Sequence, residues 1–259
     1  MSAISLRTES LCVGYRDRSV LENLTIGLPA GQSTAILGPN GCGKSTLLSA
    51  LARLLAPSHG RVFLGDADIH KTKTRLLSRQ LAILPQFPIA PEGILVGELV
   101  KRGRTPWRGL FSPWSATDTE ICQKALIAVG MEDFAGRPLS ELSGGQRQRA
   151  WLALVLAQDT PLLLLDEPTS FLDLPHQIEV LRLLQNRNKN AGTTVVSVLH
   201  DLNLAGRFND HIVLLGPDGL VTKGPPETVI TPSNLKKAFD LDARVMSDPV
   251  TNRPMVVPL

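Results

Sequence analysis

The sequence predicts an α/β protein built on a parallel sheet, with an antiparallel β subdomain at its N-terminus and a helical subdomain inserted into its middle. Three observations predict this architecture. Strand-like and helix-like segments alternate in the first and last parts of the chain, which favours parallel strands joined by right-handed crossovers. Two β-rich runs precede that alternation, and helical periodicity dominates between residues 87 and 158.

The first part of the predicted core, residues 1–86, begins with the two β-rich runs, which the polar turn RDRS separates and Pro29 and Gly31 close. A strand over STAILG follows, and then a glycine-rich loop. A helix is expected from STLLSALARLL, and it is expected to stop at Pro57 and Gly60 because proline and glycine disfavour helix interiors. GRVFLGDADI and LAILPQ are the next expected strands, the second of which ends at Pro85.

The predicted helical subdomain covers residues 87–158. Four prolines interrupt its loop-rich start, and the segment DTEICQKALIAVG then shows helical spacing. The apolar face expected for that helix consists of Ile121, Ala125, Ala128 and Val129. The core is expected to resume over residues 159–259 with the strand PLLLLD, a helix from HQIEVLRLLQ, the strand TTVVSVLH, a short helix and a hairpin around GPDG, so that residues 1–259 form one domain.

Composition excludes several classes of protein. The 259 residues carry a formal net charge of only +3, which argues against a nucleic-acid binder that works by neutralising phosphates. The three cysteines are widely spaced and odd in number, so neither a disulfide framework nor a zinc site is expected, and a reducing cytoplasm is the default. The N-terminus lacks a signal-like apolar stretch, and the apolar runs fall short of the roughly 18 residues that would suggest a membrane span.

A phosphate-binding loop is predicted where the first core strand meets the first core helix. The stretch GPNGCGKST has the spacing Gly38-x-x-x-x-Gly43-Lys44-Ser45. Glycines let backbone N–H groups converge on phosphates, the lysine reaches the outer phosphates, and the serine hydroxyl holds Mg²⁺. The alternative is an ordinary glycine turn capped by Ser45. The residues expected to bind nucleotide are Gly38, Pro39, Asn40, Gly41, Cys42, Gly43, Lys44, Ser45 and Thr46.

Two carboxylates follow the run of four leucines in LLLLDE, which describes a strand buried on both faces. Ligands of α/β folds bind at the carboxyl ends of such strands. We expect Asp166 to bind Mg²⁺ and Glu167 to act as the general base that activates water. The alternative is a solvated acidic pair at a strand end.

A second helix start with the character of an anion site is predicted at LSGGQ. Ser143, Gly144, Gly145 and Gln146 lie directly before the apolar helical run AWLALVLAQ, so small residues and free N–H groups gather at a helix N-terminus. Alone, this segment is equally consistent with an N-cap and a glycine turn. With the phosphate loop and the acidic pair, it gives one chain two phosphate-binding helix starts for one evident nucleotide.

The three segments GPNGCGKST, LSGGQ and LLLLDEP, followed by His200 at a strand end, resemble the ATP-binding cassette (ABC) ATPases over essentially the whole chain. The resemblance implies a phosphate-loop NTPase core, ATP and Mg²⁺ as cofactors, and ATP hydrolysis as the activity. It implies that Gln86 contacts Mg²⁺ and the attacking water, that His200 approaches the γ-phosphate, that Asp173 belongs to the D-loop, and that Tyr15 stacks on adenine. Phe171 departs from the family pattern, which has a small residue there.

The resemblance also implies how the chain works. Two cassettes of this family meet head to tail, with each ATP between the phosphate loop of one and the LSGGQ segment of the other. ATP closes such a dimer only by binding the closed form better than the open one, and a nearly complete shift takes roughly 5 kcal/mol of differential binding. The expected output is motion of a separate permease.

Further segments resemble the separate ATPase subunits of bacterial importers for iron–siderophore complexes, haem and vitamin B12. These segments are RGRTPW, SGGQRQRAWLALVLAQ, HDLNLA and the tail DPVTNRPMVVP, and the ferric-siderophore and ferric-citrate members look closest. The implied partners are a second copy, permease subunits and indirectly a substrate-binding protein, without nucleic acid, at the cytoplasmic face of the bacterial inner membrane. The alternatives are a haem or vitamin B12 importer, a soluble ABC ATPase of iron–sulfur cluster assembly, and a phosphate-loop switch or kinase outside the family.

Two further expectations concern single segments. The basic and aromatic stretch KRGRTPWRGLFSPW is interpreted as a surface that docks on the permease, with nucleic acid, lipid headgroups or a plain solvated loop as the alternatives. Cys42 is either a small spacer in the phosphate loop or a thiol whose pKa the helix N-terminus lowers. The second hypothesis predicts that thiol alkylation blocks ATPase activity and that ATP protects.

Overall fold

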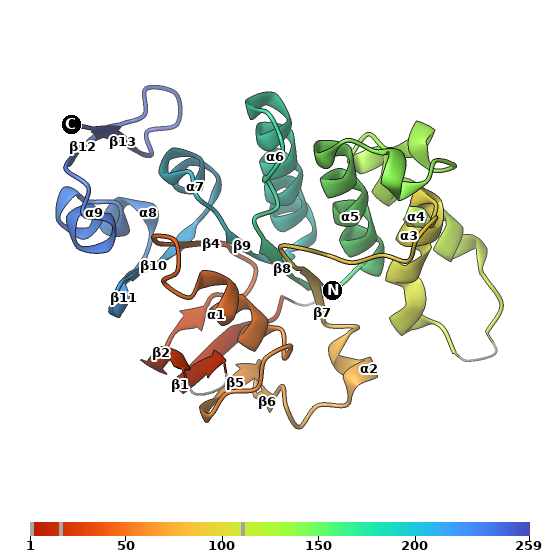
Figure 1. Ribbon diagram of the computed structural model, residues 1–259, viewed down its shortest axis with the longest axis horizontal. Coiled ribbons are helices and arrows are strands. Elements are labelled where there is room, and N and C mark those ends of the chain that lie inside the picture. The colour runs from red at the N-terminus through yellow and green to blue at the C-terminus, as the bar shows by residue number, and fades with distance from the viewer. Residues whose placement is uncertain (1–2, 16–17, 110–111) are drawn as a thin grey trace.

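A six-stranded sheet forms the centre of the protein (Figure 1). The structure, a computed structural model, describes residues 3–15, 18–109 and 112–259. The strand order is β11–β10–β4–β9–β8–β7, in which β11 is antiparallel to β10 and the other neighbours are parallel. The strands are β4 (Ser33–Leu37), β7 (Leu81–Leu84), β8 (Leu162–Asp166), β9 (Thr194–Val198), β10 (His211–Gly216) and β11 (Gly219–Gly224). The predicted parallel sheet is confirmed.

The leucine run of β8 shows why these segments form interior strands. Side chains of a strand alternate between its two faces, so a strand covered on both sides is apolar at every position. Leu162 and Leu164 pack into the hydrophobic cluster on one face of the sheet, and Leu163 and Leu165 pack into the cluster on the other. All four leucines are fully buried. Asp166 follows them as the last residue of the strand, at its carboxyl end.

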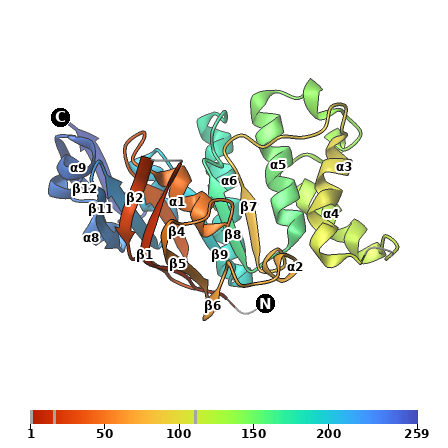
Figure 2. The same ribbon diagram turned by 60° about the horizontal axis from the view of Figure 1, so that its bottom comes forward.

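An antiparallel sheet packs over one face of the central sheet, with helix α1 (Lys44–Leu51) between the two layers (Figures 1 and 2). Its order is β2–β1–β5–β6, and β3 pairs with β1. This confirms the predicted N-terminal β subdomain, although Arg16 and Asp17 of its polar turn lie outside the described residues. The strands are β1 (Leu6–Tyr15), β2 (Arg18–Leu24), β3 (Gly27–Leu28), β5 (His59–Leu64) and β6 (Ala67–Asp68).

Every element assigned to the described residues of the inserted segment is a helix, apart from an isolated β-bridge between Leu95 and Pro138, and the segment stands beside β7 and β8 in the yellow and green part of Figure 1. Its helices share one hydrophobic cluster with those two strands. The bounds are α3 (Val96–Lys101), η1 (Arg102–Trp107), α4 (Ala116–Ala128), η2 (Glu132–Phe134), η3 (Leu139–Glu141) and α5 (Gly144–Gln158). The expected helical insertion is confirmed, while its division from the core at residues 87 and 158 stays a prediction.

The elements from α7 onward cover the other end of the central sheet, whereas Leu77 of α2 (Thr74–Leu77) packs into the first hydrophobic cluster with α1. Helices α7, α8 and α9 share a third hydrophobic cluster with β4 and β10. The expected elements did not include α2, α8 and α9, which have eight residues or fewer, or the terminal hairpin, whose two strands have five residues each. The bounds are α2 (Thr74–Leu77), α6 (Leu174–Ala191), α7 (Leu202–Phe208), α8 (Pro226–Val229), α9 (Pro232–Phe239), β12 (Ala243–Ser247) and β13 (Pro254–Pro258).

Two local predictions need correction. Helix α1 ends at Leu51 rather than near Pro57, because Arg53 takes a left-handed backbone conformation with φ 60° that no helix continues through. On α4 and its C-cap, the expected face is right for Ala125 and Val129, which are buried, and for Ile121, which packs against the cluster, but Ala128 is exposed. The buried stripe includes Cys122 and Leu126 instead, which gives the i, i+3, i+4, i+7 spacing of a helix face.

Candidate functional site

The loop between β4 and α1 wraps around a lysine ammonium group. Lys44 is 6% exposed, and its Nζ donates to the carbonyl oxygens of Gly38 and Pro39, each at 2.8 Å. Gly43, at φ 98°, turns the chain into α1, and an added Cβ would lie 2.9 Å from Leu21 Cδ2. The local geometry therefore requires the glycine, and no side chain caps the start of α1, a helix N-terminus of the kind that binds phosphate.

Ser45 and Asp166 meet beside this loop. The Ser45 Oγ donates to Asp166 Oδ1 at 3.1 Å, although the two residues are far apart in the chain. Burial raises the pKa of Asp166, the hydrogen bond from Ser45 opposes that rise, and the negative charge of Glu167 adds to it. A bound cation would relieve this unfavourable buried charge. Hydroxyl and carboxylate oxygens are ligands that Mg²⁺ prefers, so the pair fits that ion.

This pair would need further ligands to hold Mg²⁺. Among the described residues, no group of three or more His, Cys, Asp and Glu side chains could hold a metal ion. Mg²⁺ is commonly bound through one or two carboxylates together with substrate phosphates and water. The site therefore fits a magnesium–nucleotide complex rather than a metal ion held by protein alone.

Two polar side chains contact the same carboxylate oxygen of Glu167. Its Oε1 accepts a hydrogen bond from Gln86 Nε2 at 2.8 Å and lies 2.7 Å from His200 Nε2. The three residues come from the ends of β7, β8 and β9, which are neighbours in the sheet. Sheet order therefore brings together the three residues that sequence analysis assigned to catalysis.

A cavity of about 730 Å³ opens over the loop and this carboxylate. Tyr15 lies at its wall, half exposed. Two parts of the lining were missed, namely the start of β2 and Pro217. In the β1–β2 hairpin Tyr15 pairs with Arg18, so a hairpin prediction would have placed the start of β2 beside Tyr15. No sequence signal points to Pro217. The lining comprises Tyr15, Arg18, Ser19, Val20, residues 40–46, Gln86, Glu167, His200 and Pro217.

The LSGGQ segment starts α5 as predicted but does not line that cavity. Ser143 caps the helix, since its Oγ accepts from Gln146 N at 3.2 Å and its own N–H donates to Gln146 Oε1 at 3.0 Å. Ser143 to Gln146 instead line a separate depression of about 520 Å³ with Asp173 and His176. One chain thus places its two anion-suited helix starts in two different pockets.

Asp173 begins α6 at the rim of this second pocket. Its carboxylate accepts from the His176 backbone N–H at 3.4 Å and contacts the His176 ring. The hydrogen bond from His176 holds the pKa of Asp173 below its usual value. Phe171 is 70% exposed with φ 63°, and its side chain packs over Gly144. The unexpected phenylalanine therefore stands beside the glycines of the LSGGQ segment.

A sequence profile described as ABC transporter matches residues 21–170, from within β2 to the residues just after Glu167. This match covers more than half of the chain. The chain belongs to the ABC transporter family. Its activity is accordingly that of an ABC ATPase.

Curated relatives of this ABC ATPase match almost from end to end. The Achromobactin transport ATP-binding protein CbrD of Dickeya dadantii (strain 3937) is 47% identical and covers 100% of this chain and 95% of its own length. The Iron(3+)-hydroxamate import ATP-binding protein FhuC of Bacillus subtilis (strain 168) is 47% identical, with coverage of 97% and 93%. The Ferric enterobactin transport ATP-binding protein FepC of Escherichia coli (strain K12) is 45% identical, with coverage of 100% and 95%.

Solved structures agree with this assignment. A metal-chelate type ABC transporter in an inward-facing conformation matches 99% of this chain and 97% of its own with a TM-score of 0.83 and 30% identity. The dimeric bacterial ABC transporter cassette MJ0796 matches 85% of this chain and 98% of its own with a TM-score of 0.78 and 26% identity. The ABC cassette fold predicted from the sequence is confirmed.

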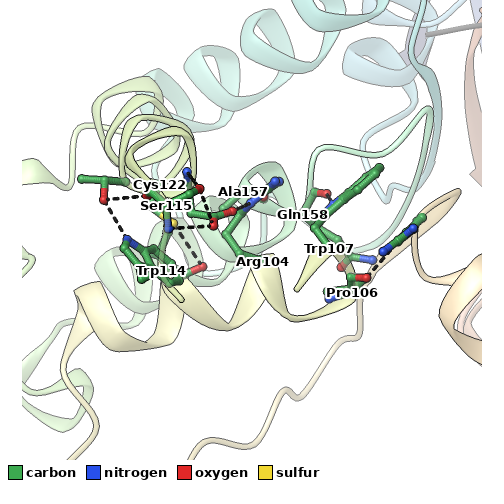
Figure 3. Close-up of polar contacts among 12 residues, drawn as sticks. Arg104, Pro106, Trp107, Trp114, Ser115, Cys122, Ala157 and Gln158 are labelled. Atoms are coloured by element: carbon green, nitrogen blue, oxygen red, sulfur yellow. Dashed lines mark hydrogen bonds and ion pairs between the residues drawn. The ribbon is translucent and has the colours of Figure 1, made fainter. Parts of the chain in front are cut away.

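The interpretation of the basic stretch as a docking surface does not hold for Arg104 and Trp107, whereas Lys101 and Arg102 are exposed and the interpretation stays a prediction for them. Arg104 is 6% exposed and pairs with Asp118 at 2.9 Å, while its Nη1 donates to Ala157 O (Figure 3). Trp107 Nε1 donates to Gln158 O at 2.6 Å. These side chains hold η1 against the C-terminal end of α5, so they serve the fold. Leu110 and Phe111 of the stretch lie outside the described residues.

The structure also contradicts a lowered pKa for Cys42. Its thiol is 8% exposed, and burial raises its pKa more than the nearby Lys44 charge lowers it. We therefore expect iodoacetamide to modify the half-buried Cys12 before Cys42 at neutral pH, and the modification of Cys42 to accelerate as pH rises.

The check is peptide mass spectrometry over time, with Cys12→Ser as the control that isolates the slower sites. ATPase activity should persist while Cys12 is modified and fall only with Cys42. Faster labelling of Cys42 than of Cys12 at pH 7 would contradict this expectation.

Proposed function

We propose that this ABC ATPase is the motor subunit of a bacterial importer that carries ferric siderophores through a separate permease. The relatives named for achromobactin, iron(3+)-hydroxamate and ferric enterobactin transport support this cargo class, at 45–47% identity over nearly their whole length. The Cobalamin import ATP-binding protein BtuD of Halobacterium salinarum reaches 36%, with 64% of its length covered. The comparison thus favours siderophores over vitamin B12.

The observation that carries the proposal is the separation of the two helix starts into two pockets. A second copy, turned head to tail, brings its Ser143 and Gly144 to the phosphates held by Lys44 of the first. ATP then contacts both subunits in the closed dimer and only one in the open form. This difference in contacts drives closure, and hydrolysis removes it.

The nucleotide cavity gives each proposed site residue a role. Tyr15 stacks on adenine, and Lys44 with the loop amides holds the phosphates. Ser45 and Asp166, with Gln86 nearby, would hold Mg²⁺, and the ion would supply positive charge beside the outer phosphates. The oxygen of a water molecule attacks the γ-phosphorus, Glu167 accepts a proton from that water, and ADP leaves with its β-phosphate oxygen.

His200 contacts the Glu167 carboxylate on the side of the cavity and is 49% exposed at its side chain. That position lets it meet both the base and a γ-phosphate. Asp173, at the edge of the second pocket, faces the other subunit in the proposed dimer. The roles of these two residues therefore depend on dimer closure.

A surface groove suits the permease. Gln86, Phe87 and Pro88 form one wall, and Trp151 of α5 forms part of the other. Phe87 is 73% exposed and the nearby Ile89 is 93% exposed, which is an unusual concentration of apolar surface. Because Gln86 also holds Glu167, a permease segment in this groove would sense the state of the nucleotide site. No helix within the described residues is long and apolar enough to cross a membrane itself.

The experiment is uptake of radioactive iron as its siderophore complex by a host strain that lacks this gene. We expect uptake to fall to background, to return with the wild-type chain, and not to return with Glu167→Gln. Pull-down of the tagged chain from detergent-solubilised membranes should recover the permease. Vitamin B12 and haem uptake, measured in parallel, should persist.

Three outcomes would contradict the proposal in different ways. Loss of vitamin B12 or haem uptake instead of siderophore uptake would reassign the cargo. Intact uptake of all three, with lower activity of iron–sulfur enzymes, would favour the cluster-assembly alternative. Recovery of soluble partners alone would remove the permease from the proposal.

A further inference from the structure

A buried glutamine in α5 connects the LSGGQ segment to Glu167. Gln148 is 7% exposed, and its Nε2 donates to the backbone carbonyl oxygen of Glu167 at 3.1 Å. It lies five residues after Ser143, about 7 Å along the helix. No sequence motif assigns a role to Gln148.

The backbone of Glu167 needs such support. With φ 50° it occupies the left-handed region, which is uncommon for residues other than glycine and persists where surrounding contacts enforce it. The Ser170 Oγ also donates to the Glu167 carbonyl oxygen, at 2.8 Å, but it lies only three residues away on the same turn. Gln148 is the donor from another element, so it fixes the turn relative to α5.

We infer that Gln148 is a positioning residue that sets Glu167 for water activation when the LSGGQ end of α5 closes on the partner's ATP. The inference rests on the role proposed above for Glu167. Helix α5 is a rigid body over one and a half turns, so movement of Ser143 is passed to Gln148 and then to the Glu167 carbonyl. Closure of the dimer around the partner's ATP thereby adjusts Glu167, the base beside the ATP of its own subunit.

This link predicts a specific kinetic defect. Misplacement of a catalytic group by about 1 Å can cost about a hundredfold in rate, whereas ATP affinity depends on the loop around Lys44, which Gln148 does not touch. We expect Gln148→Met to lower kcat about tenfold or more and to change the KM for ATP less than about twofold. Methionine has a similar shape, and Ser170 still satisfies the carbonyl, so folding should be retained.

The matched control is Gln158→Met, at the other end of the same helix. The Gln158 Nε2 donates to the carbonyl oxygens of Ser78 and Leu81 at 2.7 and 2.9 Å, and Gln158 is not among the residues that line the nucleotide cavity. This variant should lower the melting temperature and keep kcat. Gln148→Met should instead lower kcat and keep the melting temperature. A second variant, Gln148→Asn, keeps an amide that is too short to reach the carbonyl and should repeat the kcat defect.

The test is steady-state ATPase kinetics and thermal unfolding of the purified full chain, together with ATP-driven dimerisation in the Glu167→Gln background. Dimerisation should be retained when Gln148→Met is added, because Gln148 positions Glu167 only after the dimer has closed on ATP. Wild-type kcat in either folded Gln148 variant, kcat losses that track melting temperature across all variants, or loss of dimerisation would each overturn the inference. Failure of the Glu167 assignment would show separately, as wild-type turnover by Glu167→Gln alone.

Discussion

Glu167→Gln is expected to reduce steady-state ATP turnover at least about a hundredfold, because an amide cannot accept the proton of the attacking water. ATP binding should persist, since Lys44 and the loop carbonyls that hold it are untouched. With binding retained and hydrolysis removed, the closed dimer should accumulate. The measurement is phosphate release, combined with the molar mass in solution with and without ATP.

A matched control separates the base from a general effect of lost charge. Glu179 is an exposed glutamate on α6 that lies outside the nucleotide cavity. Glu179→Gln should hydrolyse ATP at the wild-type rate and should dimerise no more than the wild type. A wild-type rate in Glu167→Gln would instead assign water activation to another group.

The phosphate loop and the acidic pair could be predicted because each is a short segment whose chemistry is local, whereas Gln86, His200, Asp173 and Tyr15 were assigned only through the family resemblance. The glycine spacing before Lys44 forms a cradle by itself, and the leucines before Asp166 require a buried strand that ends in carboxylates. Their convergence is then a consequence of sheet topology, because parallel strands end at one edge. The contacts of Ser45 with Asp166 and of Gln86 with Glu167 agree with that expectation.

What the sequence did not reveal depends on contacts between distant segments. Arg104 was interpreted as a surface residue because arginine is usually exposed, and nothing marks Asp118 as its partner. Nothing in the helical pattern of α5 distinguishes Gln148 from its neighbours. Only the path of the turn after β8 puts the carbonyl oxygen of Glu167 within reach of the Gln148 side chain. Pro217 lines the cavity because β10 pairs with β4, a pairing that no local pattern specifies.

Arg104→Met is expected to lower the free energy of unfolding by about 3–5 kcal/mol, the usual cost of leaving one partner of a buried ion pair alone. Both side chains are less than a tenth exposed, and the pair joins η1 to α4 while Arg104 also reaches α5 through Ala157 (Figure 3). The matched control is Lys124→Met, which removes the exposed pair between Lys124 and Glu120 on the same helix α4. Exposed pairs contribute little, so that variant should unfold like the wild type.

The pH dependence of the free energy of unfolding tests the buried pair between Arg104 and Asp118 separately. Burial alone raises the pKa of Asp118, but the hydrogen bonds from Arg104 and Ser115 outweigh it and leave that pKa below its ordinary value. A carboxylate with a lowered folded pKa stabilises the fold above its unfolded pKa, and this contribution is lost as pH falls through the folded pKa.

In Arg104→Met the unpaired Asp118 should take up a proton at a higher pH than in the wild type, which removes the buried charge. The deficit of the variant should therefore be largest near pH 7 and shrink as urea unfolding is repeated toward pH 4. A deficit independent of pH would mean that Arg104 acts through packing rather than through its charge. An equal loss in Lys124→Met would mean that burial of the pair has no energetic consequence.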